Sequence, residues 1–129
     1  MRQAGLVLVV EDDDSVRKYT AASLKRLGHE VLQASGGAEA IAILRSRAET
    51  ISVVLLDQTM PGLSGEDVLD EMASAGVAVP VVLTSGHDRK SMQRRLAGRS
   101  VAGFLQKPFR LKTLEETISA VMEQSAQTS

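Results

Sequence analysis

Charged side chains directly follow apolar segments of the sequence at three places. They are Glu11 and Asp12 after residues 6–10, Asp57 after residues 51–56, and Lys107 after residues 101–106. If these segments are parallel strands, their carboxyl ends meet at one edge of a sheet, and the charged groups converge there. Clustered carboxylates repel one another, and a hard divalent cation such as Mg²⁺ removes that repulsion while binding phosphate oxygens. A lysine beside such a site can neutralise a carboxylate and contact a phosphoryl oxygen as a point charge.

Hydroxyl groups add to this set, because Thr84 and Ser85 lie at the end of a fourth apolar segment and such small polar groups can hydrogen-bond a phosphoryl oxygen. Each feature also has a simpler explanation. The acidic run 11–14 can be a loop that caps the helix after it, with Asp14 as the capping residue. Lys107 can be a solvated lysine at a strand end, and residues 84–86 can be an ordinary turn. Four such strand ends in one chain favour a phosphate-binding site over these separate explanations.

Short apolar segments alternate with segments of helical periodicity, and this alternation must position the charged groups. The apolar segments are residues 6–10, 30–34, 51–56, 79–84 and 101–106, and the helical ones are about 15–28, 37–46, 64–76, from 88 onward, and 111–123. Segments rich in Val and Leu are typical of parallel strands covered on both faces, whereas 30–34 is more polar, like an edge strand. Strict β-α alternation predicts a doubly wound α/β sandwich. In the second helix, the residues expected to face the core are Ala38, Ile41, Ala42 and Leu44.

The composition is that of one ordinary domain without a charge bias. The chain has 129 residues, a formal net charge of −1 and no cysteine. This charge gives no preference for nucleic acid or anionic membrane, and the lack of cysteine excludes disulfides, a thiol nucleophile and a cysteine metal site. No apolar stretch has membrane-spanning length, and residues 1–5 leave no room for a signal peptide before the first strand. We therefore expect a cytoplasmic domain without membrane insertion.

Four short motifs, in this order and spacing, resemble those of one family. They are Val9-Val10-Glu11-Asp12-Asp13, Leu56-Asp57 with Met60-Pro61-Gly62 and Gly65, residues 80–86 (PVVLTSG), and residues 104–109 (FLQKPF). Over essentially its whole length the chain resembles the receiver domain of bacterial two-component response regulators. The resemblance implies a flavodoxin-like (βα)5 fold with a parallel sheet of order 2-1-3-4-5. It also implies Mg²⁺-dependent phosphorylation of an aspartate by a histidine kinase or a histidine phosphotransfer protein.

The resemblance implies how the charged residues divide the chemistry. Asp57 is expected to be the phosphoacceptor, and Lys107 is expected to contact the phosphoryl group. Glu11 and Asp12 form the acidic pair that binds Mg²⁺ (or Mn²⁺), together with Asp57 and the backbone carbonyl of Thr59. Asp12 is expected to be the more direct metal ligand of the acidic pair.

The resemblance also implies a switch. Ser85 is expected to be the switch hydroxyl, and Phe104 occupies the aromatic switch position, where it must act through packing because it cannot hydrogen-bond. Phosphorylation is expected to change the face of the fourth helix, fifth strand and fifth helix, where a downstream protein can bind. The phosphoryl donor is expected to dock on the residues beside the site, which are Ser15, Lys18, Tyr19, Ala22 and the loop at Phe109-Arg110.

Two other function classes use parts of the same chemistry. An aspartate-nucleophile phosphatase of the haloacid dehalogenase type needs an Asp-x-Asp motif, and this chain reads Asp57-Gln58-Thr59 instead. A nucleotide-binding module needs a glycine-rich phosphate motif that the sequence lacks. We therefore expect residues 1–129 to form a single receiver domain, with a core at about 5–123 and a polar tail at 124–129. We expect no enzyme beyond self-directed phosphotransfer and autodephosphorylation, no direct DNA binding, and either a single-domain regulator or the receiver of a hybrid histidine kinase.

Overall fold

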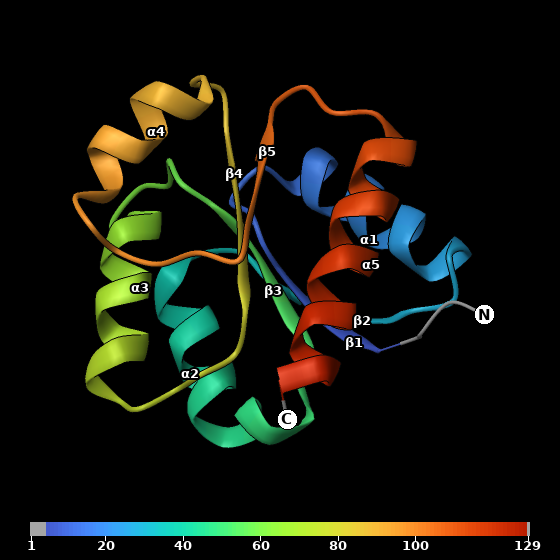
Figure 1. Ribbon diagram of the computed structural model, residues 1–129, viewed down its shortest axis with the longest axis horizontal. Coiled ribbons are helices and arrows are strands. Elements are labelled where there is room, and N and C mark those ends of the chain that lie inside the picture. The colour runs from blue at the N-terminus through green and yellow to red at the C-terminus, as the bar shows by residue number, and fades with distance from the viewer. Residues whose placement is uncertain (1–4, 129) are drawn as a thin grey trace.

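The computed structural model describes residues 5–128 and shows a five-stranded parallel sheet with helices on both faces (Figure 1). The strands are β1 (Leu6–Val10), β2 (Glu30–Ala34), β3 (Val53–Asp57), β4 (Val81–Ser85) and β5 (Gly103–Gln106). The helices are α1 (Asp14–Arg26), α2 (Gly37–Arg47), the 3-10 helix η1 (Ala48–Thr50), α3 (Gly65–Ser74), α4 (Arg89–Leu96) and α5 (Leu111–Thr128). The strand order is β2-β1-β3-β4-β5, which confirms the predicted doubly wound, flavodoxin-like fold.

Two apolar clusters fill the space between the sheet and its helices. In Figure 1, α1 and α5 lie on one side of the strands, and α2, α3 and α4 lie on the other. Because side chains alternate along a strand, Val7 and Val9 of β1 pack under α1 and α5, while Leu8 and Val10 pack under the other three helices. Each fully buried Val or Leu stabilises the fold by about 1.5–3 kcal/mol. This two-sided burial holds the central strand ends in fixed positions.

The predicted cap of α1 is wrong by one residue. Asp13, not Asp14, has extended backbone angles, and its carboxylate accepts the N–H of Val16 at 3.0 Å. A capping side chain must come from the last residue before the helical dihedrals begin, and Asp14 already belongs to the first turn. Its carboxylate instead pairs with Arg17 on the same helix.

Two further helical details differ from the sequence prediction. In α2 the buried residues are Gly37, Ala40 and Leu44, while Ala38 and Ala42 are exposed. Alanine is small and common on both faces of helices, so the pattern in this segment marks the inward face poorly. Helix α5 continues to Thr128, beyond its predicted end at 123, because no glycine or proline interrupts the last turns.

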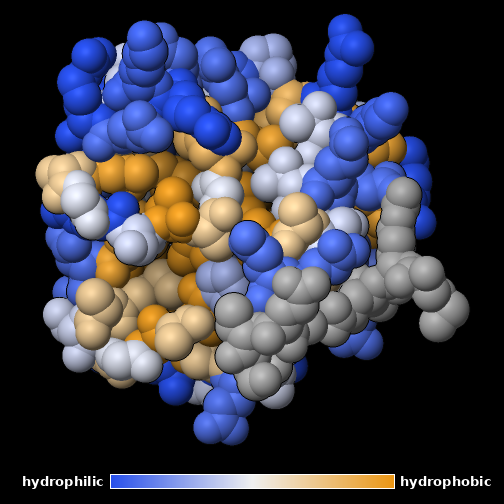
Figure 2. All heavy atoms as spheres, in the orientation of Figure 1, coloured by the Kyte–Doolittle hydropathy of each residue, from blue (hydrophilic) through white to orange (hydrophobic). Residues whose placement is uncertain are grey.

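The side of the molecule shown in Figure 2 has a hydrophilic ridge above an apolar hollow. The ridge is α4, which carries Arg89, Lys90, Arg94 and Arg95. Beneath it lies a hollow of about 210 Å³ whose apolar lining residues are Met92, Leu96, Val101, Ala102 and Phe104. Among residues 5–128, none of the helices is both long and apolar enough to cross a membrane.

Candidate functional site

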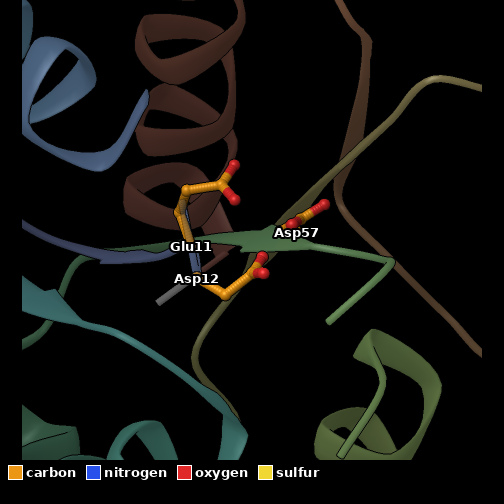
Figure 3. A group of neighbouring side chains, drawn as sticks. All are labelled: Glu11, Asp12 and Asp57. Carbon is orange, nitrogen blue, oxygen red and sulfur yellow. The ribbon is translucent and has the colours of Figure 1, made fainter. Parts of the chain in front are cut away.

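The acidic residues converge because β1 and β3 are neighbours in the sheet. Val10 lies opposite Leu56, so the residues that follow them, Glu11 after β1 and Asp57 in β3, lie at the same edge of the sheet. Figure 3 shows these two side chains with Asp12 around one small space, and one carboxylate oxygen from each of the three lies within 4.8 Å of the other two. Glu11 and Asp57 are each only 5% exposed, whereas Asp12 faces solvent. The structure therefore brings the three predicted acids together.

Lys107 reaches the same space from the end of β5. Its ammonium lies 2.5 Å from Glu11 Oε1 and 3.3 Å from Asp57 Oδ1. The backbone N–H of Lys107 donates to the carbonyl of Ser85 at 2.7 Å, which ties the strand end of β5 to that of β4. The side chain then crosses the end of β4 to contact both acids. This position is the one expected for a cation that binds an anion attached to Asp57.

The largest electrostatic effect in this cluster is the raised pKa of Asp57. Burial raises the pKa of Asp57 to about 7, the neighbouring Glu11 carboxyl adds to the rise, and the ammonium of Lys107 opposes it. Burial by itself would lower the pKa of Lys107, but its hydrogen bond to Glu11 and the negative charges of both acids raise that pKa overall. The lysine therefore stays charged at neutral pH, while Asp57 is held near its midpoint of titration.

The donor set fits a divalent cation. When all three carboxylates are ionised, they and the ammonium carry a formal charge of −2 (−3 + 1), which a divalent cation neutralises. Carboxylate oxygens are also ligands that Mg²⁺ prefers. Thr59 lies in the turn after β3, and its N–H donates to Asp57 Oδ1 at 3.3 Å. The turn thus keeps the backbone of Thr59 next to the acids, and metal binding by its carbonyl stays a prediction.

The sequence profile of the response regulator receiver domain matches residues 7–119. This chain belongs to the response regulator receiver family. The receiver domain is 32% identical over 117 residues to sensor kinase CckA of Brucella abortus (strain 2308), covering 91% of this chain and 12% of that protein. It is 33% identical over 118 residues to nodulation protein W of Bradyrhizobium diazoefficiens (strain JCM 10833 / BCRC 13528 / IAM 13628 / NBRC 14792 / USDA 110), covering 92% of this chain and 51% of that protein.

The fold of the receiver domain is also found in solved structures. The crystal structure of the receiver domain from hybrid histidine kinase CckA aligns with a TM-score of 0.76 and 35% identity, covering 92% of this chain and 99% of that one. The chain spans about half of nodulation protein W and about an eighth of CckA. Family membership gives the domain a signalling role as a phosphoacceptor.

The two predicted switch residues of the receiver domain lie on the neighbouring strands β4 and β5. Ser85 ends β4 and is 1% exposed, and its hydroxyl bonds to the side chain of Gln58 at 3.1 Å. Phe104 on β5 is half-buried and packs against the apolar cluster under α4. Their roles as a coupled switch stay predictions.

Sequence reasoning missed two residues of this site. Gln58 is 2% exposed, and the alternation of β3, which puts residue 58 on the same face as buried Leu56, could have marked it as an unusual buried polar group. Arg17 donates to the carbonyl of Glu11 at 2.9 Å and also pairs with Asp14, so it braces the acidic loop from α1. No motif in the sequence marks Arg17, because the contact depends on how α1 packs.

Proposed function

We propose that Asp57 accepts a phosphoryl group from a phosphohistidine of a histidine kinase or histidine phosphotransfer protein, in a reaction that requires Mg²⁺. The observation that carries the proposal is the position of the Lys107 ammonium, 3.3 Å from Asp57 Oδ1, beside three clustered carboxylates. An acid used only for folding would not need two further acids and a cation within contact of it.

The chain's residues support each part of the transfer. A carboxylate oxygen of Asp57 attacks phosphorus, the P–N bond to histidine breaks, and its electron pair returns to the imidazole ring. Glu11, Asp12, Asp57 and the carbonyl of Thr59 would hold Mg²⁺, whose positive charge would offset the charge of the phosphoryl oxygens. Lys107 provides a second positive charge on the same oxygens, since its long side chain already reaches Asp57.

The phosphoryl group adds about two negative charges where two acids already lie. We propose that Ser85 then turns towards a phosphoryl oxygen and that Phe104 moves into the space this opens, which changes the face formed by α4, β5 and α5. The apolar hollow under α4, lined by Phe104 itself, supports this face as the surface that a downstream protein reads (Figure 2).

The proposed donor surface is exposed beside the site. Ser15, Lys18, Tyr19 and Ala22 all face solvent on α1, and Tyr19 is 67% exposed, so its ring is available for contact with a donor. Arg110 is also exposed in the loop after Lys107. Likeness to the receiver of hybrid histidine kinase CckA favours a donor of the hybrid-kinase type. We also propose a cytoplasmic location.

We further propose that the domain turns over no metabolite and does not contact DNA directly. A haloacid dehalogenase-type phosphatase is disfavoured because the residue two positions after Asp57 is Thr59, whose side chain cannot act as a general acid at neutral pH. The proposed domain covers residues 1–129 as one unit, either as a single-domain regulator or within a hybrid histidine kinase.

Incubation with acetyl phosphate and Mg²⁺, followed by intact mass measurement, tests the function. We expect one phosphoryl group that hydroxylamine removes, and none after Asp57→Asn or when EDTA is present. The matched control is Asp70→Asn, an exposed aspartate on α3, which should label like the wild type. Labelling that persists in Asp57→Asn would refute the assignment.

A further inference from the structure

The hydroxyl of Ser85 makes two hydrogen bonds in this structure. Its oxygen accepts the backbone N–H of His87 at 3.1 Å, and its proton is donated to Oε1 of Gln58 at 3.1 Å. A serine hydroxyl has a single proton. Ser85 therefore cannot donate to a phosphoryl oxygen on Asp57 until it has released Gln58.

Gln58 is a fixed acceptor because both its backbone and its side chain are held. Its N–H donates to the carbonyl of Thr84, and its carbonyl accepts the N–H of Gly65, each at 2.9 Å. A Cβ atom at Gly65 would lie 2.8 Å from the Cα of Gln58, so the α3 backbone closes directly on this residue. The Thr59 hydroxyl also donates to Oε1 of Gln58, at 3.3 Å. The buried side-chain oxygen thus remains where Ser85 meets it.

We propose that Gln58 is a latch that holds Ser85 in the unphosphorylated position and so sets how strongly a phosphoryl group must bind to switch the domain. This inference rests on the proposed function of Asp57. The side-chain oxygen of Gln58 accepts the hydroxyl proton of Ser85, which is then not available to a phosphoryl oxygen. When Ser85 leaves, Gln58 keeps its hydrogen bond from Thr59, so the released state is not penalised by a buried acceptor without a partner. Gln58 is a positioning residue, since it acts only through Ser85.

The latch predicts that removing the acceptor makes switching easier. Gln58→Leu keeps much of the buried volume but cannot accept a hydrogen bond. The unswitched state then loses one buried hydrogen bond, and the affinity for a phosphoryl mimic should rise by about 2- to 12-fold. Beryllofluoride with Mg²⁺ is the probe, titrated against the whole chain by calorimetry, with the amide resonances of Ser85 and His87 followed by NMR.

Two controls separate the latch from packing. Gln33→Leu makes the same substitution at an exposed position of β2 and should leave the affinity unchanged. In a Ser85→Ala background, Gln58→Leu should change the affinity by less than about 2-fold, because the interaction is already absent. An equal gain in both backgrounds would show that Gln58 acts by packing and would overturn the latch. If Gln58→Leu does not fold, as judged by circular dichroism, Gln58→Met replaces it as a flexible, unbranched alternative.

The outcomes also separate the latch from the proposed function. If the wild type takes no phosphoryl group and no beryllofluoride, the function of Asp57 fails. If the wild type binds beryllofluoride and Gln58→Leu binds it with equal or lower affinity, the function stands and the latch is refuted. Tighter binding that depends on Ser85, with an altered resting resonance at Ser85 and His87, supports the latch.

Discussion

Replacing Asp57 by Asn should stabilise the metal-free domain at neutral and alkaline pH. The folded state raises the pKa of Asp57 from 3.8 to about 7, so folding favours its neutral form. For an acid with a raised folded-state pKa, the native state binds more protons than the unfolded state between these two values. The free energy of unfolding therefore falls as pH rises from about 4 to 7, and the loss is complete above pH 7. Asparagine is neutral throughout and avoids that loss.

The pKa difference sets the size of the effect. From 3.8 to about 7, at about 1.4 kcal/mol per pKa unit, the upper bound is roughly 4 kcal/mol. Side-chain relaxation, water and dissolved ions reduce this value, so we expect Asp57→Asn to gain about 1–3 kcal/mol at pH 8. At pH 5 the gain should fall to less than about half of its value at pH 8, because the wild-type carboxyl is then protonated in the folded state.

Urea denaturation of the wild type and Asp57→Asn in EDTA measures the difference in their free energies of unfolding at pH 5 and at pH 8. Glu49→Gln, at an exposed glutamate in η1 far from the site, serves as the matched control and should change little at either pH. Adding Mg²⁺ at pH 8 should stabilise the wild type but not Asp57→Asn, and so reduce the difference between their free energies of unfolding. An Asp57→Asn protein that is no more stable than the wild type at pH 8, or a gain that is the same at pH 5, would refute the electrostatic reasoning.

Three other outcomes follow from the same structure. Mg²⁺ affinity should weaken as pH falls below about 7, because Asp57 takes up a proton when the metal is released. Calorimetry in buffers of different ionisation enthalpy would measure this proton uptake. An Mg²⁺ affinity that is the same at pH 8 and pH 6 would contradict the raised pKa of Asp57. Lys107→Met should retain Mg²⁺ binding yet lose the beryllofluoride-induced NMR change at Phe104, and an unchanged response would exclude its proposed role. Asp13→Ala should cost about 1 kcal/mol by thermal unfolding through loss of the α1 cap, whereas Asp14→Ala should cost less, and the reverse order would contradict the observed cap.

The convergence of Glu11, Asp12, Asp57 and Lys107 was predictable because it depends on topology rather than on fine packing. Near-continuous Val and Leu segments identify buried parallel strands, and the carboxyl ends of such strands share one edge. The residues that follow those segments must therefore meet, whatever their rotamers. The motif resemblance added the strand order, which the alternation of segments does not specify.

The predictions that failed concern where a helix begins or ends and which of its faces is buried. Asp13 and Asp14 are equally good capping residues by type, so the sequence could not say which one stands outside the first helical turn. In α2, alanines at 38, 40 and 42 give almost no contrast between faces, and packing against α3 and the sheet selected Ala40. Local preference is too weak in these places to decide against tertiary contacts.

The sequence by itself determined the family of this chain, the alternation of strands and helices, and the set of charged groups at the sheet edge, because these follow from short-range periodicity and from four motifs. The tertiary structure alone decided how those groups pair. Lys107 meets Glu11 across 96 positions of the chain, and Ser85 meets Gln58 across 27. Such contacts, and the raised pKa of Asp57 with its cause in burial, arise only when distant strand ends are packed together and water is removed. The position of Asp57 at the sheet edge was therefore visible in the sequence, while the hydrogen bond between Ser85 and Gln58 was visible only in the fold.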